Sequence, residues 1–96
     1  MEKNLFNAYS SIISSEVKIS IILVLYKKIL TPKRISQLTN KRINHISTYL
    51  TQLKKNNIVI CLNEEMKKGR LYKLTELGNK VEGELRANQY SLNTLK

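Results

Sequence analysis

The spacing of apolar residues divides the first half of the chain into short helices. Apolar side chains recur every three or four residues, the period of one helical face, over 4–14, 16–30, 32–38 and 41–56. Ser14 and Ser15 precede the second segment, and Thr31 and Pro32 begin the third; all four residues favour the start of a helix. The β-branched residues within 16–30 would also suit a strand, but the length of that segment favours a helix.

Residues 39–42 form a short turn between the third and fourth of these segments. Thr39 and Asn40 are expected to end one helix and to cap the next. In the fourth segment one stripe of residues is expected to be buried, and it consists of Ile43, Ile46, Tyr49, Leu50 and Leu53. Two helices joined by so short a turn are typical of a helix-turn-helix.

The pattern changes after Asn57, a residue that tolerates the left-handed conformation found at helix ends. Residues 58–63 and 70–75 have the character of strands, and the polar segment 64–69 ends in glycine, as hairpin loops do. Thr75 suits the start of a final helix, whose apolar residues recur at heptad-like spacing. A hairpin directly after a helix-turn-helix predicts a winged helix-turn-helix, an α+β fold that is mainly α-helical with one small β-hairpin.

Length and charge limit the domain organisation and the partner. The 96 residues suffice for one domain. The chain carries 17 basic and 7 acidic residues, and 13 of the basic ones lie in residues 17–75 beside only Glu64 and Glu65. An AT-rich genome would explain many lysines but not the scarcity of acids. A segment this positive predicts a polyanionic partner, with nucleic acid as the first expectation and an acidic protein or a membrane surface as alternatives.

The residues that catalysis and metal binding require are scarce. The chain has one histidine, one cysteine and no aspartate, so we expect no enzymatic activity, no metal site and no cofactor. Cys61 lies in an apolar segment and is expected to be buried and inert. The longest apolar run, 21–26, is far shorter than a membrane span, and the start of the chain has no signal-peptide pattern. These features predict a cytoplasmic protein, associated with the nucleoid and with no membrane.

Two stretches of the sequence resemble the winged helix-turn-helix transcription regulators, especially the small MarR/ArsR-like group common in archaea. Residues 46–59 (ISTYLTQLKKNNIV) are similar to the recognition-helix pattern of that family, and residues 69–78 (GRLYKLTELG) to its wing and the start of the next helix. The resemblance covers residues 16–85. Asn57 stands where the family usually has glycine, and the Cys and His clusters of its metal-sensing members are missing. The basic character is also similar to that of small crenarchaeal chromatin-type winged-helix dimers.

The resemblance implies double-stranded DNA as the partner, with two sets of contacts. The fourth helix would enter the major groove with its N-terminal half, and its candidate contacts are Lys41, Arg42, Asn44, His45, Ser47, Thr48 and Gln52. Phosphates and the minor groove would be met by a second set of cations, which are Lys33, Arg34, Lys55, Lys67, Lys68 and Arg70. For each position the alternative is an ordinary solvated side chain.

The two ends of the chain carry more apolar residues than one small domain must bury. They predict a homodimer interface made of Leu5, Phe6, Tyr9, Ile12, Ile13, Val81, Leu85, Leu92 and Leu95. The alternative is that both stripes pack on their own core. The expected organisation is a dimerisation helix over 1–15, a DNA-binding domain over 16–78 and a second dimerisation helix over 79–96.

These features predict a homodimeric, sequence-specific transcription regulator. Two alternatives remain open from the sequence: a non-specific architectural protein of chromatin, and a winged helix that serves as a protein-interaction module. The sequence identifies neither an operator nor a small-molecule effector.

Overall fold

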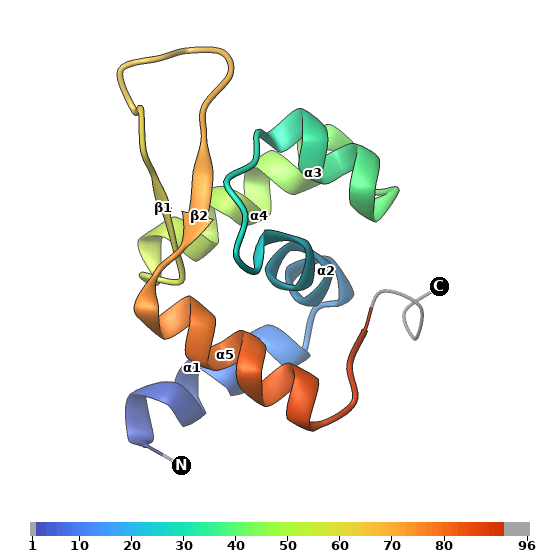
Figure 1. The fold of residues 1–96 in the computed structure, drawn as a ribbon, viewed down its shortest axis with the longest axis vertical. Helices are drawn as coiled ribbons and strands as arrows, with labels where there is room; N and C mark the ends of the chain where they lie inside the picture. The colour runs from blue at the N-terminus through green and yellow to red at the C-terminus, as the bar shows by residue number, and fades with distance from the viewer. Residues whose placement is uncertain (1, 92–96) are drawn as a thin grey trace.

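The computed structural model describes residues 2–91 and arranges them as five helices and one β-hairpin (Figure 1). The order of elements is the predicted one, and the α+β winged-helix fold is confirmed. The bounds are α1 Lys3–Ile13, α2 Glu16–Leu25, α3 Pro32–Thr39, α4 Ile43–Lys55, β1 Val59–Cys61, β2 Tyr72–Leu74 and α5 Glu76–Ala87.

Helix α2 ends at Leu25, earlier than the pattern over 16–30 predicts. The backbone leaves the helical region at Tyr26 and becomes left-handed at Lys27, with φ of 59°. After this turn Leu30 forms an isolated bridge to β2, because it exchanges two backbone hydrogen bonds with Tyr72, at 3.0 and 2.9 Å. Pairing with a distant strand therefore overrides the helical pattern of the sequence here.

Polar side chains cap three of the helices as predicted. The hydroxyls of Ser15, Thr31 and Thr75 accept hydrogen bonds from the backbone N–H groups three residues later, at the starts of α2, α3 and α5. The prediction for the turn between α3 and α4 is only half right. Asn40 ends α3 in the left-handed conformation, but the residue at the start of α4 is Arg42, which makes no side-chain cap.

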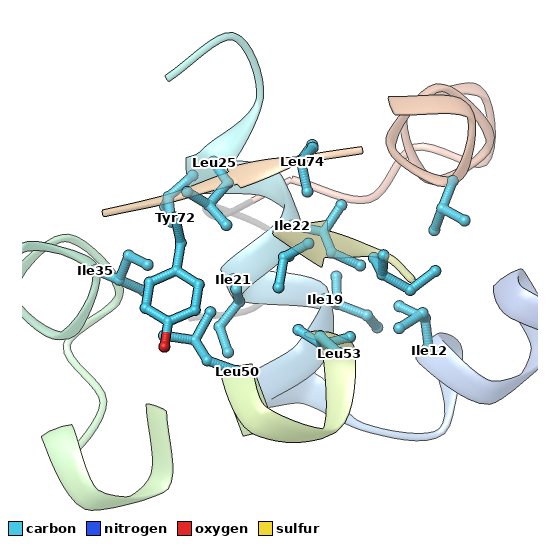
Figure 2. Close-up of a cluster of buried hydrophobic side chains, with 14 of the residues drawn as sticks. Ile12, Ile19, Ile21, Ile22, Leu25, Ile35, Leu50, Leu53, Tyr72 and Leu74 are labelled. Atoms are coloured by element: carbon cyan, nitrogen blue, oxygen red, sulfur yellow. The ribbon is translucent and has the colours of Figure 1, made fainter. Parts of the chain in front are cut away.

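Helix α2 lies at the centre of the core and is buried on most of its surface. Figure 2 shows its isoleucines and Leu25 surrounded by side chains from four other elements. These neighbours are Ile12 of α1, Ile35 of α3, Leu50 and Leu53 of α4, and Tyr72 and Leu74 of β2. Each such side chain contributes about 1.5–3 kcal/mol to stability when it is fully buried. Because α2 packs against side chains from all these elements, it joins the helix-turn-helix to the terminal helices.

The hairpin is short, and its two faces differ. The strands are antiparallel, with Val59 opposite Leu74 and Ile60 opposite Lys73. Val59, Tyr72 and Leu74 are buried against the helices, whereas Ile60 and Lys73 face outward. The alternation of buried and exposed side chains holds the hairpin on the core with its loop, residues 62–71, projecting beyond it as the wing (Figure 1).

Candidate nucleic-acid interface

A groove of about 590 Å³ separates the wing from helices α3 and α4. Four of the predicted DNA-binding cations meet along it: Lys33 from the start of α3, and Lys67, Lys68 and Arg70 from the wing. Ser47 of α4 also lines it. Residues far apart in the sequence thus form a single positively charged hollow beside the helix predicted to read DNA. The wing rises next to α3 at the top of Figure 1.

The groove also contains two residues of α4 that sequence reasoning missed. Ile43 and Thr51 line it on either side of Ser47, one helical turn away in each direction. Ile43 was expected in the buried stripe, but 50% of it is exposed, so that expectation is wrong. The four-residue spacing of 43, 47 and 51 is a signal that could have identified this line of residues.

The remaining predicted base contacts lie on the exposed surface of α4 outside this groove. Asn44 and Thr48 lie along the middle of the exposed face of α4. His45 and Gln52 lie on the side of α4 that is turned away from the groove. Within residues 2–91 the side chains of Asn44, His45 and Gln52 form no hydrogen bond. Their donors and acceptors are therefore free for bases or water.

The hydroxyl groups of α4 are partly used within the helix. Thr48 donates a hydrogen bond to the carbonyl oxygen of Asn44 at 2.9 Å, and Thr51 donates to that of Ser47 at 3.0 Å. Each threonine then presents only acceptor lone pairs to a ligand, unless its hydroxyl rotates.

The cations near the start of α4 differ in whether their side chains already have a partner within the protein. Lys41 forms an ion pair with Glu16 of α2, with Nζ 3.0 Å from Oε1. Arg34 donates to the side chain of Gln37 at 3.3 Å, whereas Arg42 is exposed. Because Arg42 caps α4 without a side-chain hydrogen bond, the first N–H groups of this helix lack a side-chain acceptor. Such groups attract phosphate.

The wing owes its shape to two side chains whose bonding the sequence did not reveal. Asn63 joins the two arms of the loop: its Oδ1 accepts from the N–H of Leu71 at 2.7 Å, and its Nδ2 donates to the carbonyl of Gly69 at 3.2 Å. Arg70, predicted only as a DNA contact, donates to the carbonyls of Met66 at 2.7 Å and Glu64 at 3.1 Å. Gly69 itself has a φ of 69°, which glycine adopts without strain.

A charged contact ties the wing to the end of α4. Lys54 donates a hydrogen bond to Glu64, which raises the pKa of the Lys54 ammonium and lowers the pKa of the Glu64 carboxyl group. Glu64 therefore points at Lys54, and the wing cations Lys67 and Lys68 stay exposed. Lys55, the next residue on α4, is exposed as well.

The residues predicted for a dimer interface divide into three groups. Ile12, Val81 and Leu85 are buried in the protein's own core, against which Leu5 and Tyr9 are partly packed. Phe6 and Ile13 of α1 remain 56% and 40% exposed. Leu92 and Leu95 lie outside the described residues. Phe6 and Ile13 are therefore the exposed large hydrophobic side chains of α1.

Other candidate chemistry is sparse in the part of the chain that the structure describes. Residues 2–91 contain no group of three or more His, Cys, Asp or Glu side chains that could hold a metal ion. Cys61 is half-buried, not fully buried as predicted, with Sγ 3.6 Å from the Oδ1 of Asn63. No single helix in this region is long and apolar enough to cross a membrane; α1 and α2 meet that test only jointly, and they are bent by 118° at their junction.

One solved structure is similar over nearly the whole chain. HlyU from Vibrio cholerae N16961 is 22% identical, with a TM-score of 0.65, and the match covers 94% of this chain and 98% of that one. No protein-family model matches the chain. No curated protein sequence matches it significantly. The similarity to HlyU shows that the chain has the winged-helix fold.

Proposed function

We propose that this protein is a transcription regulator that binds double-stranded DNA in a sequence-specific manner as a homodimer. The observation that carries the proposal is the groove between the wing and α4, where Lys33, Lys67 and Lys68 lie beside Ser47 and Thr51 of α4. The similarity to HlyU supports the winged-helix fold on which this proposal rests. A regulator of this kind would act at the nucleoid.

The proposed complex has α4 in the major groove and the wing at the neighbouring minor groove. Asn44 and Gln52 have free amides, the groups that read adenine by paired hydrogen bonds. Lys67 and Lys68 would meet the negative potential of a narrow minor groove. The hydroxyls of Ser47 and Thr48 add weaker contacts, because serine and threonine discriminate less between bases.

The homodimer would form through the terminal helices, with residues 1–15 and 79–96 flanking the DNA-binding domain. Phe6 and Ile13 support this arrangement, because they lie seven residues apart on one face of α1 and are both exposed, so a partner helix could cover them together. A two-fold dimer would read a pseudo-palindrome with half-sites about 34–36 Å apart or a multiple of that distance.

Sedimentation velocity tests the dimer. Phe6→Glu should shift the protein toward the monomer, because a charge would be buried at the contact. Asn4→Glu, on the same helix and also exposed, is the matched control for the added charge. A monomeric wild-type protein, or equal association of both variants, would remove α1 from the interface.

Fluorescence anisotropy tests DNA binding, with the duplex upstream of the protein's own gene compared with a scrambled duplex of equal composition. A regulator should bind the upstream duplex tighter by about 10³-fold or more. Negligible binding to either duplex at low salt would contradict the proposal and leave an interaction module for an acidic protein.

A second candidate is a non-specific architectural protein. The observation that favours it is the use of the Thr48 and Thr51 hydroxyl donors within α4, which leaves fewer groups to read bases. In that case the protein would bind both duplexes equally tightly. The slope of log K for binding against the logarithm of the salt concentration would be about −0.9 for each phosphate contact.

A further inference from the structure

Two lysines lie beside α4 on the side away from the wing. Lys18 of α2 has its Nζ 5.8 Å from the ring centre of Tyr49. Tyr49 is two residues from both Ser47 and Thr51, so it projects from the opposite side of α4 to the line that faces the wing groove. Lys41 precedes α4 and reaches Glu16, which lies two residues before Lys18 in the first turn of α2. Helix α4 is therefore flanked by cations on both sides.

The two flanks differ in one respect. On the wing side, Lys67 and Lys68 make no ion pair within residues 2–91. On the α2 side, Lys41 is held by the Glu16 carboxylate at 3.0 Å. The pair lies at the surface, with side-chain exposures of 28% for Lys41 and 52% for Glu16, so another anion has access to it.

A helix in the major groove has a phosphate backbone on each side, because the groove is bounded by two strands about 12 Å apart. The wing groove supplies cations for one of these strands. The other strand would run along the α2 side, past Lys18 and the Glu16–Lys41 pair.

We propose that Lys18 and Lys41 form a second phosphate-binding site on the α2 side of α4. In the free protein the Glu16 carboxylate pairs with the Lys41 ammonium group, and a DNA phosphate displaces that carboxylate on binding. The inference rests on the proposed DNA-binding function. A carboxylate and a phosphate oxygen compete for the same ammonium group, so Glu16 lowers the affinity of the free protein for any duplex. Weak, exposed pairs of this kind are readily exchanged. The Glu16–Lys41 pair is thus an autoinhibitory contact within the interface.

The test measures the dissociation constant and its salt dependence for one duplex that the wild-type protein binds. Glu16→Gln should tighten binding by about three- to fivefold, because Lys41 no longer has to leave a partner. Lys41→Met and Lys18→Met should each weaken binding and lower the slope of log K against log salt by about 0.9. In a protein that already carries Lys41→Met, the further substitution Glu16→Gln should no longer tighten DNA binding.

Glu76→Gln is the matched control, because it removes the same charge from the exposed start of α5. It should change the dissociation constant by less than about twofold, since charges beyond about 10 Å are largely screened at 0.1 M salt. Lys18→Gln serves as a second variant, in case methionine alters the packing on Tyr49, and circular dichroism checks the fold of each protein.

The outcomes separate this inference from the proposed function. If the wild-type protein binds DNA but Lys18 and Lys41 variants keep its affinity and salt slope, the second phosphate site does not exist. Equal effects of Glu16→Gln and Glu76→Gln would remove the inhibitory role of Glu16. Absence of duplex binding by the wild-type protein itself would overturn the proposed function, and this inference with it.

Discussion

Lys54, near the end of α4, donates a hydrogen bond of 2.5 Å to Glu64 at the base of the wing. The helix proposed to read DNA and the wing proposed to flank it are thereby joined by a charged contact as well as by the sheet. Asn63 and Arg70 close the wing on itself, and the wing lysines Lys67 and Lys68 line the groove beside α4.

We expect Lys54→Met to loosen the wing. Once the Lys54 ammonium group is removed, the Glu64 carboxylate has lost its partner on α4. The backbone N–H groups of residues 64–70 should then exchange with deuterium faster than in the wild-type protein. Lys55→Met is the matched control, because Lys55 is the next residue on α4 and forms no ion pair within residues 2–91. Hydrogen exchange measured by mass spectrometry gives the comparison. Equal exchange in both variants would mean that the contact between Lys54 and Glu64 does not hold the wing.

The same contact predicts a pH dependence with a definite sign. The hydrogen bond from Lys54 lowers the pKa of the Glu64 carboxyl group from its ordinary value of 4.5. The contact is therefore intact above that range and is lost as the pH falls through the lowered pKa. It is also lost at high pH, but only as the pH rises through the raised pKa of Lys54. A carbon-13 NMR titration should show the pKa of Glu64 rise in Lys54→Met; an unchanged pKa would contradict the geometry.

Two glycines of α5 should respond in opposite ways to the same substitution. A Cβ atom added at Gly78 would lie 2.2 Å from the carbonyl oxygen of Ile58, whereas one added at Gly83 would meet no atom within 4 Å. Gly78→Ala should therefore destabilise the protein by about 1–3 kcal/mol, since backbone must move. Gly83→Ala should stabilise it by about 0.5–1 kcal/mol, because alanine loses less entropy in a helix.

Urea denaturation measures both changes. A fall in stability of 1 kcal/mol lowers the melting temperature of a domain this size by about 4–8 °C, so thermal melting offers a second readout. If Gly78→Ala were as stable as the wild-type protein, α5 would have to be able to shift away from Ile58 without loss of packing.

Asn63→Ala should weaken DNA binding without changing any charge. The substitution removes the two hydrogen bonds that join the arms of the wing, and the loss of affinity should reach about tenfold if both are needed for the bound shape. Asn79→Ala, at an exposed position of α5, is the control. Wild-type affinity in Asn63→Ala would show that the wing adopts its bound shape on the DNA itself.

Local chemistry was sufficient to predict where most helices begin. Ser15, Thr31 and Thr75 cap helices because their side chains satisfy nearby N–H groups, an interaction that depends only on neighbouring residues. Asn57 adopts the expected left-handed conformation, with φ of 61°, for a similarly local reason. The order of the elements, and with it the winged-helix fold, follows from these signals and from the apolar periods.

Long-range contacts decided the rest. Helix α2 stops at Leu25 because Leu30 pairs with Tyr72, a residue more than 40 positions away, and no local pattern encodes that pairing. Ile43 has the spacing of a core residue, yet the core is already filled by Ile46, Leu50 and Leu53, so Ile43 is left in the groove. Burial depends on what packs opposite a side chain, and periodicity alone does not specify it.

The candidate interface divides in the same way. The sequence by itself determined the kind of surface, because an excess of cations in residues 17–75 and polar positions on one helix can be counted without a structure. Only the tertiary structure decided which cations are free: Lys67 and Lys68 are exposed, Lys41 is held by Glu16, Lys54 by Glu64, and Arg70 binds the wing's own carbonyls. The physical reason is that a charge interacts over a few ångströms in space, and folding brings together residues that the chain separates.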